Sequence, residues 1–240
     1  MVKIAVNGAL GRMGSRILAL AAEQPKHFKV VQTFDLGGKA ENLSSYANGG
    51  KKLLCDVLID FSGPEGARGS VDAARFSKKA VVIGSTGLDE ELVKKIRSAA
   101  KAVPVVLSSN MSVGVTLVQE LVAQAAKKLS EDFSVQMTEA HHCHKKDAPS
   151  GTALMLLQAI AGARKWDKGR TLKEKNQIHS IREGEIVGDH TVLFSGPSET
   201  IEITHRAQSR DTFARGALVA ALFLSKKKKG FFSMQQVLGL

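Results

Sequence analysis

The sequence has little cysteine, few aromatic residues and no long apolar segment. Two cysteines among 240 residues are too few for a disulfide scaffold and favour reduced thiols. An aromatic content of 5%, with one Trp and one Tyr, leaves little material for stacking against nucleic-acid bases. No segment approaches the roughly 20 apolar residues that span a bilayer, and the first residues lack the apolar core of a secretion signal. We therefore expect a cytoplasmic protein that binds neither nucleic acid nor membrane.

The charge is strongly positive but scattered. The formal net charge is +11, and the only basic block is Lys226 to Lys229, which follows an apolar helical segment and is expected to be solvated. Such a charge suits a nucleic-acid binder, but it suits a protein with phosphorylated or carboxylated small ligands equally well. Charge alone does not choose between them.

Strand and helix signals alternate through the first half of the chain. Short apolar segments predict strands, amphipathic segments between them predict helices, and residues 36–50 predict a loop with little core. Parallel strands need crossover connections, so this alternation predicts an α/β, Rossmann-type, doubly wound parallel sheet. The expected strands are 2–6, 29–34, 57–61, 80–83 and 105–107, and the expected helices are 12–23, one starting near 64, and 89–102.

The second half has a different pattern. Helices are expected at 113–128, 152–163 and 212–224, and strands near 134–138, 178–183, 186–194 and 200–205. This pattern predicts a second, mixed α+β domain. Because the last long helix can pack back on the first domain, we place one domain at 1–111 and 212–240 and the other at 112–211.

A glycine-rich turn follows the first strand. Gly8, Gly11 and Gly14 form G-A-L-G-R-M-G, and Asp35 ends the second strand. Such glycines bring backbone N–H groups and a helix N-terminus against a pyrophosphate, and the acid can bind the adenine ribose hydroxyls. Leu10 replaces the second glycine of the usual G-x-G-x-x-G, so the motif alone is weak, and a tight turn with a solvated Asp is the alternative.

Coenzyme choice depends on the charges near this turn. Asp35 disfavours the 2′-phosphate of NADPH by repulsion, whereas Arg12, Arg16 and Lys39 can offset it. We therefore expect good use of NADH, with NADPH possible. Two further segments at expected strand ends, G-S-T-G from Gly84 and S-S-N-M from Ser108, are either ligand contacts or ordinary turns.

A cluster of titratable residues lies between Glu139 and Thr152, in E-A-H-H-C-H-K-K-D-A-P-S-G-T. A ring dicarboxylate undergoing hydride reduction needs cations for its carboxylates, N–H donors and a proton donor. His141 can donate the proton near neutral pH, Lys145 offers a charged donor, and the Ser-Gly-Thr turn offers donors at a helix start.

Three alternatives for this cluster were weighed. Metal binding has ligands in H-H-C-H, but no second group appears at metal-site spacing, and Lys145 and Lys146 repel a cation, so no metal is expected. Cys143 and Ser150 lie in no recognisable nucleophile motif. A polar loop that starts a helix explains Asp147 and Ser150, but not the histidines.

Taken together, the chain resembles the dihydrodipicolinate reductase family, and the agreement runs nearly end to end. The matching segments are G-A-L-G-R-M-G, D-F-S-G-P-E-G, G-S-T-G, N-M-S-V-G-V, the His segment, I-R-E-G-E-I-V-G-D-H-T and E-I-T-H-R-A-Q-S-R-D-T-F-A. The chain departs from some members at Leu36 and Gly63, where they have basic residues. Both departures weaken the expectation of strict NADPH dependence.

The resemblance implies a two-domain subunit, usually in a homotetramer, that reduces a cyclic imine dicarboxylate with NADH or NADPH in lysine and diaminopimelate biosynthesis. Domain 112–211 then binds substrate and forms the oligomer. His141 matches the acid/base residue, Lys145 a second proton donor, and His142, Gly151 and Thr152 match substrate contacts. The matches to cofactor contacts are Gly8, Ala9, Leu10, Gly11, Arg12, Met13, Asp35, Gly84, Ser85, Thr86, Ser108, Ser109, Asn110 and Met111.

Two other functions remain as alternatives. Another Rossmann oxidoreductase of aspartate-family amino-acid metabolism shares the first half, but it has no reason for the His segment. A nucleotide-sensing or nucleic-acid-binding protein would explain the +11 charge, and salt-dependent DNA binding would support it.

Overall fold

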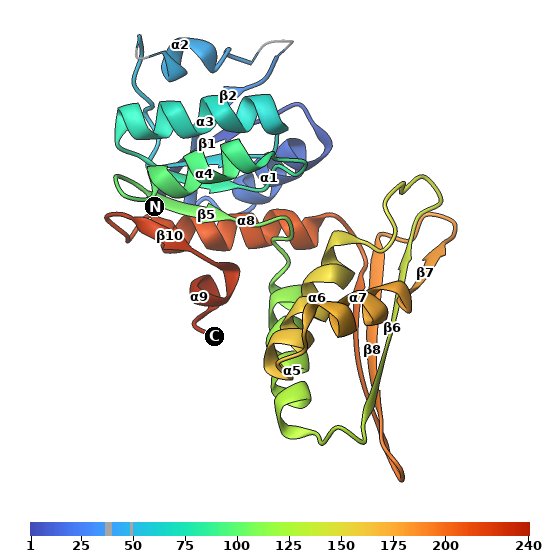
Figure 1. The fold of residues 1–240 in the computed structure, drawn as a ribbon. Coiled ribbons are helices and arrows are strands. Elements are labelled where there is room, and N and C mark those ends of the chain that lie inside the picture. The colour runs from blue at the N-terminus through green and yellow to red at the C-terminus, as the bar shows by residue number, and fades with distance from the viewer. Residues whose placement is uncertain (37–39, 49) are drawn as a thin grey trace. The chain divides into compact units, whose positions relative to one another are not determined.

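The computed structural model describes residues 1–36, 40–48 and 50–240, and its chain folds into two compact units (Figure 1). Unit 1 consists of Met1–Ser112 and Asp211–Gly239, and unit 2 of Val113–Arg210 with Leu240. The sequence analysis drew the boundaries after residues 111 and 211. The substrate and oligomer roles that it gave to the second domain stay predictions.

Unit 1 is built on a six-stranded sheet in the order β10-β5-β4-β3-β1-β2, and all of its pairings are parallel. Strands β3 and β4 are buried at every position, as expected for a sheet that is covered on both faces. The predicted Rossmann-type fold is confirmed. The strands are β1 (Val2–Asn7), β2 (Phe28–Phe34), β3 (Val57–Asp60), β4 (Ala80–Ile83), β5 (Pro104–Leu107) and β10 (Gly230–Phe232).

Helices cover both faces of this sheet (Figure 1). On one face α1 (Arg12–Ala22) and α8 (Asp211–Leu224) share a core with Ile4 and Ile59. On the other, α2 (Ser44–Ala47), α3 (Pro64–Ser77) and α4 (Glu90–Ala99) pack on Leu58 and Ile83. The short helix α9 (Met234–Leu238) follows β10. Two separate cores therefore hold the strand ends rigidly in place.

Unit 2 contains a four-stranded mixed sheet in the order β7-β6-β8-β9, with β7 parallel to β6 and the other pairs antiparallel. Helices α5 (Val113–Lys128) and α6 (Gly151–Ala163) share an apolar core with alternate residues of β8, such as Val192 and Phe194, and α7 (Lys168–Asn176) packs beside α6. The strands are β6 (Ser134–His141), β7 (His179–Arg182), β8 (Gly188–Ser195) and β9 (Thr200–Ala207).

Some local predictions were wrong. The region 36–50, expected to be a loop with little core, contains α2 and buries Leu43 and Tyr46. Helix α7 was not predicted, because its residues are polar and none is buried. The strand expected at 134–138 continues to His141, and this extension determines the geometry of the site.

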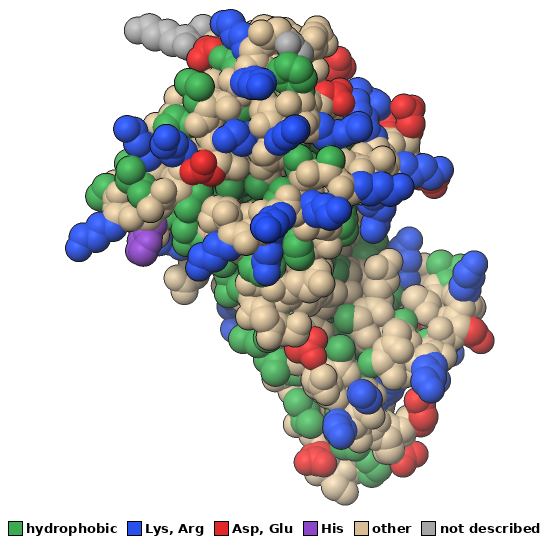
Figure 2. Space-filling view, turned by 90° about the vertical axis from the view of Figure 1, so that its left-hand side faces the viewer, with side chains coloured by type: hydrophobic (Ala, Val, Ile, Leu, Met, Phe, Trp, Pro, Cys, Tyr) green, Lys and Arg blue, Asp and Glu red, His purple; other side chains and the backbone are tan. Residues whose placement is uncertain are grey.

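The surface agrees with the scattered charge of the sequence. On the face in Figure 2, Lys and Arg side chains are spread over both units and do not gather into one patch. Among the described residues, no helix combines the length and apolar character that a membrane crossing needs.

Candidate active site

A tight turn between β1 and α1 holds the predicted cofactor-binding glycines. Gly8 has a φ of +79°, a region that glycine tolerates, and the N–H groups of Gly8 and Ala9 donate to the Phe34 carbonyl at 2.9 and 3.1 Å. A Cβ on Gly14 would lie 2.0 Å from the Gly8 oxygen, so glycine there lets α1 pack onto the turn. Gly11 caps α1 without a side-chain hydrogen bond. The first N–H groups of α1 can therefore receive a pyrophosphate.

Asp35 closes against this turn. Its carboxylate accepts hydrogen bonds from the backbone N–H of Leu10 at 2.9 Å and of Leu36 at 2.8 Å. The Leu36 side chain is 92% exposed. The acid that was predicted to bind ribose thus also orders the glycine turn, and the next side chain is free to meet whatever the ribose carries.

The basic residues proposed to offset Asp35 have different surroundings. Arg16 makes a bidentate ion pair with Asp211, at 2.6 and 2.8 Å. Arg12 is exposed, and no ion pair joins it to an acid in the described ranges. Met13 packs partly buried against the core of unit 1. Lys39 lies outside the described residues, so Arg12 is the cation left at the start of α1.

Gly84, Ser85 and Thr86 follow β4. A Cβ on Gly84 would lie 2.2 Å from the Phe61 ring. The Ser85 hydroxyl donates to the buried Asp60 carboxylate at 2.5 Å and accepts from the Gly63 N–H at 2.9 Å. Thr86 is exposed. The Ser85 hydroxyl therefore holds two neighbouring loops together, and the exposed Thr86 is the side chain in this segment that can reach a ligand.

Ser108 to Met111 follow β5. The Ser108 hydroxyl donates to the Asn110 carbonyl at 2.5 Å, and the Asn110 side-chain oxygen accepts from the Ser112 N–H at 2.8 Å. Ser109 is exposed, while Met111 is buried in the core. Met111 anchors the segment and Ser109 faces solvent.

The strand register brings these segments to one edge of the sheet. Asn7 pairs with Phe34 and Asp60, and Ile83 pairs with Asp60 and Leu107. The carboxyl ends of five parallel strands therefore align, which is where ligands bind in open α/β sheets. The glycine turn, Asp35 and the two later segments all leave the sheet at this edge.

In unit 2, His141 is the last residue of β6, and Glu139 lies on the same face two residues earlier. His141 Nδ1 is 2.5 Å from Glu139 Oε2. Arg182, which pairs with His141 in the strand register, donates from Nη2 to Oε1 at 2.7 Å and from Nη1 to Oε2 at 3.0 Å. The Ser150 N–H adds a fourth donor at 3.2 Å. Glu139 is fully buried, and all four contacts converge on its carboxylate.

The ionisation of this group follows from burial and charge. Burial opposes ionisation of Glu139, but hydrogen bonds from Arg182 and His141 outweigh it and lower the pKa to about 2. Burial also lowers the pKa of His141; the Glu139 carboxylate opposes that shift, while Lys145 and Arg182 add to it. Near neutral pH the ligand-free chain thus has an ionised Glu139 beside a neutral His141.

The other ring nitrogen of His141 faces β8. A Cβ on Gly188 would lie 3.0 Å from His141 Nε2. The His190 ring packs edge-on at 5.1 Å from the His141 ring, and its Nε2 is 3.0 Å from the Ser150 hydroxyl. Burial, with the nearby His141, lowers the pKa of His190 to about 3, so it is neutral. Glycine at 188 leaves the Nε2 edge of His141 open.

The predicted substrate contacts surround the end of β6. Lys145 donates to Asp147 at 2.8 Å, and a turn joins the Lys145 N–H to the His142 carbonyl at 3.1 Å. His142 Nδ1 is buried and has no hydrogen-bond partner among the described residues. Gly151 and Thr152 open α6, where a Cβ on Gly151 would meet open space. These polar groups converge on the His141 side of unit 2.

Glu139, His141 and His190 also present potential metal ligands within 4.8 Å of one another. The guanidinium of Arg182, however, already binds both Glu139 oxygens. A fixed positive charge there repels a cation. The cluster is better explained as a hydrogen-bond network.

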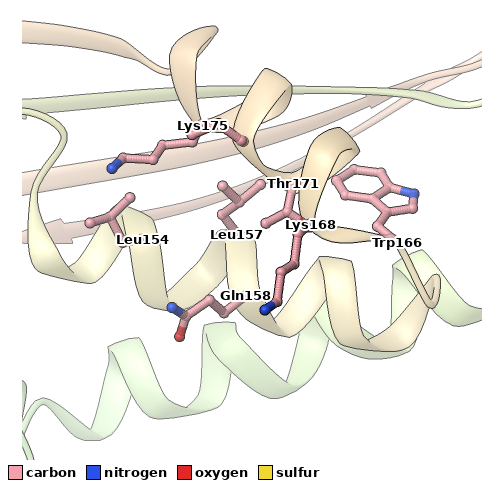
Figure 3. Close-up of a pocket in the computed structure, with 8 residues that line it drawn as sticks. Leu154, Leu157, Gln158, Trp166, Lys168, Thr171 and Lys175 are labelled. Atoms are coloured by element: carbon pink, nitrogen blue, oxygen red, sulfur yellow. The ribbon is translucent and has the colours of Figure 1, made fainter.

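A hollow of about 330 Å³ lies between α6 and α7 (Figure 3). Leu154 and Leu157 from α6 face Thr171 and Lys175 from α7, and Trp166 lies at one end. None of the predicted site residues lines this hollow in the described part of the chain. It is therefore separate from the His141 cluster.

Comparison with known proteins gives the family. The model for the N-terminal part of dihydrodipicolinate reductase matches residues 2–111, and the model for the C-terminal part matches residues 114–238. The chain belongs to the dihydrodipicolinate reductase family. It is an NAD(P)H-dependent oxidoreductase of the reduction step in lysine and diaminopimelate biosynthesis.

Individual relatives agree over their full length. The 4-hydroxy-tetrahydrodipicolinate reductases of Zymomonas mobilis and Aquifex aeolicus are each 41% identical, with 100% of this chain covered and 98% and 99% of theirs. The dipicolinate-bound dihydrodipicolinate reductase of Paenisporosarcina sp. TG-14 has the same fold, with a TM-score of 0.81, 21% identity and 98% of each chain covered. The resemblance seen in the sequence motifs is confirmed.

The sequence analysis missed Glu139 and Arg182 as site residues. A signal for Glu139 was present, because residues two apart on a strand share a face, and E-x-H places a carboxylate beside His141. Arg182 lies 43 positions from Glu139, and only the pairing of β6 with β7 brings it close. No local pattern in the sequence indicates that pairing.

Proposed function

We propose that this enzyme binds 4-hydroxy-tetrahydrodipicolinate at the end of β6 in unit 2 and reduces it to tetrahydrodipicolinate, with His141 supplying the proton. The observation that supports this most directly is the position of His141. A buried imidazole with one open nitrogen lies beside Lys145 and the N-terminus of α6. A proton donor and two kinds of carboxylate-binding group thus occur within one short segment.

The carboxylates of the substrate find complementary donors around this imidazole. The ammonium of Lys145 supplies a charge, and the first N–H groups of α6, at Gly151 and Thr152, supply dipoles that favour an anion. His142 Nδ1, buried and unpartnered in the described structure, can complete the set. We assign His142, Gly151 and Thr152 to substrate binding.

Protonation of the reduced ring is assigned to His141. Hydride addition leaves an electron pair on the conjugated imine, and a proton must be added for the charge to balance. Burial keeps His141 neutral in the free chain, but two substrate carboxylates nearby favour the imidazolium. Substrate binding thereby charges the donor, and Lys145 is the second donor that supports it.

The coenzyme is assigned to the carboxyl edge of the parallel sheet in unit 1, and when bound it supplies the hydride. The free N–H groups at the start of α1 and the glycine turn fit a pyrophosphate, and Asp35 fits ribose hydroxyls. With Leu36 after the acid and Arg12 as the remaining nearby cation, we propose that NADH is used well and that NADPH is accepted.

Assembly and location are further parts of the proposal. Residues 112–211 are assigned to substrate binding and to a homotetramer, because α5, α6 and α7 lie on one face of the unit 2 sheet and the opposite face has no helix over it in the described ranges (Figure 1). A cytoplasmic location suits a biosynthetic reaction and the unpaired Cys55 and Cys143. Light scattering should give four chains per particle.

The assay follows the absorbance of the reduced coenzyme while the substrate is generated enzymatically. We expect substrate-dependent oxidation of NADH and of NADPH, and no oxidation with aspartate semialdehyde, the substrate class of the alternative Rossmann enzyme. No oxidation of either coenzyme with the dipicolinate-pathway imine would contradict the proposal.

A further inference from the structure

We infer that Glu139, held by Arg182, is the positioning residue for His141, and that it makes Nε2 the ring nitrogen that delivers the proton. This inference rests on the proposed role of His141. It adds two residues to the machinery, Glu139 and Arg182, and it names the reacting atom, which the sequence motifs leave open.

The argument begins with the carboxylate. Glu139 is fully buried, and Arg182 donates to both of its oxygens. An arginine stays protonated in proteins, and a bidentate pair of this kind holds the carboxylate ionised and fixed in orientation. Glu139 is therefore an acceptor only.

The tautomer of His141 follows from that state. Nδ1 is 2.5 Å from a Glu139 oxygen that has no proton to give, so Nδ1 must carry the hydrogen. In the neutral ring Nε2 then has the lone pair. When the ring becomes charged, the additional proton is on Nε2. The carboxylate thus determines which nitrogen gains and releases a proton.

Access to Nε2 depends on Gly188. The first carbon of any side chain at this position would lie 3.0 Å from Nε2 and 3.3 Å from Cδ2 of the same ring. Glycine keeps that edge uncovered, while the His190 ring at 5.1 Å supports the flank of the imidazole. One ring nitrogen is bound to the protein and the other is left for a ligand.

The same contacts join the proton donor to the substrate-binding turn. Glu139 accepts from the N–H of Ser150, the N-cap of α6, at 3.2 Å. Arg182 also donates to the Asp147 carbonyl at 2.6 Å. His141, the loop with Lys145 and the start of α6 are therefore all positioned by one buried ion pair.

Four groups act on the charge of His141: Glu139 from its own strand, Lys145 from the following loop, Arg182 from β7 and His190 from β8. Only Glu139 favours the imidazolium. Replacing it by Gln should therefore lower the proton affinity of His141, and the limb of kcat/KM that falls with rising pH should move to lower pH.

The test is a double-mutant cycle with Glu139→Gln and His141→Gln. If Glu139 acts through His141, Glu139→Gln should lower kcat by about 10- to 100-fold in the wild-type background and by less than about threefold in the His141→Gln background. Glu131→Gln is the matched control, since Glu131 is an exposed partner of Arg170 at 3.0 Å, and it should leave kcat unchanged. Glu139→Asp, which keeps the charge, should retain the pH profile better than Glu139→Gln does.

The outcomes separate the two claims. Equal losses in both backgrounds would show that Glu139 acts only on the fold, and would overturn the inference. An unchanged kcat in His141→Gln alone would instead remove the proposed proton donor. Should Glu139→Gln not fold, ¹⁵N-histidine NMR of the wild type decides, with His141 assigned from His141→Gln: the Nδ1–H tautomer is expected, and the Nε2–H tautomer would refute the inference.

Discussion

Removing Arg182 tests the physical basis of the site, because it leaves a buried carboxylate without its cation. In Arg182→Met the apolar part of the side chain remains, but Glu139, which is fully buried, loses both guanidinium hydrogen bonds. Only His141 and the Ser150 N–H then remain as partners. The free energy of unfolding should fall accordingly.

The magnitude follows from the pKa of Glu139. Each tenfold change in proton affinity corresponds to about 1.4 kcal/mol. The fall from an ordinary 4.5 to about 2 in the folded chain therefore represents about 3 kcal/mol of stability near neutral pH. That value agrees with the roughly 3 to 5 kcal/mol lost when one partner of a buried ion pair is removed.

The pH dependence has a definite sign. Because folding lowers the pKa of Glu139, its contribution is complete above 4.5 and declines as the pH falls from 4.5 towards 2. Arg182→Met lacks this contribution. The difference in unfolding free energy between the wild type and the variant should therefore shrink by about half between neutral pH and about pH 3.

Urea unfolding followed by Trp166 fluorescence measures this difference, because the chain has one tryptophan and it lies in unit 2. Arg206→Met is the control, since Arg206 is 68% exposed and pairs with Asp189 at 3.6 Å. It should cost less than about 1 kcal/mol. A loss of that small size in Arg182→Met, or a difference that does not change with pH, would refute the reasoning.

Three other substitutions test the rest of the site. Gly188→Ala places a carbon 3.0 Å from His141 Nε2, and kcat/KM for the imine should fall at least about tenfold while the fluorescence-monitored stability is kept; an unchanged kcat/KM would show that Nε2 is not the reacting edge. Leu36→Arg adds a cation at an exposed position after Asp35 and should raise the NADPH to NADH ratio of kcat/KM about tenfold; an unchanged ratio would place the ribose elsewhere. Ser85→Ala removes a 2.5 Å donor from buried Asp60 and should destabilise unit 1 by about 1 to 3 kcal/mol in urea unfolding followed by circular dichroism; a loss below about 0.5 kcal/mol would contradict that role.

Much of the fold was predictable because local pattern and burial agree. Strand β4, with four buried apolar residues, and helix α5, ending in Lys127 and Lys128, have the bounds that the sequence predicted. The polar α7 and the region around α2 were not predictable in this way. The core contacts of Leu43 and Tyr46 with α3 come from tertiary packing, which outweighs local composition.

The site divides in the same way. His141, Lys145 and the turn at Gly151 lie in one short segment, so residue type and spacing were enough to predict a site there. Its orientation depends on contacts over long sequence separations. Arg182 and Gly188 come from strands on either side of β6, and only the sheet brings them to the two nitrogens of one imidazole.

The central claim is that His141 protonates the substrate during reduction. Single-turnover kinetics of coenzyme oxidation, measured for the wild type, His141→Gln and His142→Gln at saturating imine, test it most directly. We expect His141→Gln to slow the reduction step by about 10²- to 10⁴-fold, while His142→Gln mainly raises the imine concentration needed for saturation. A reduction step of wild-type rate in His141→Gln would contradict the account.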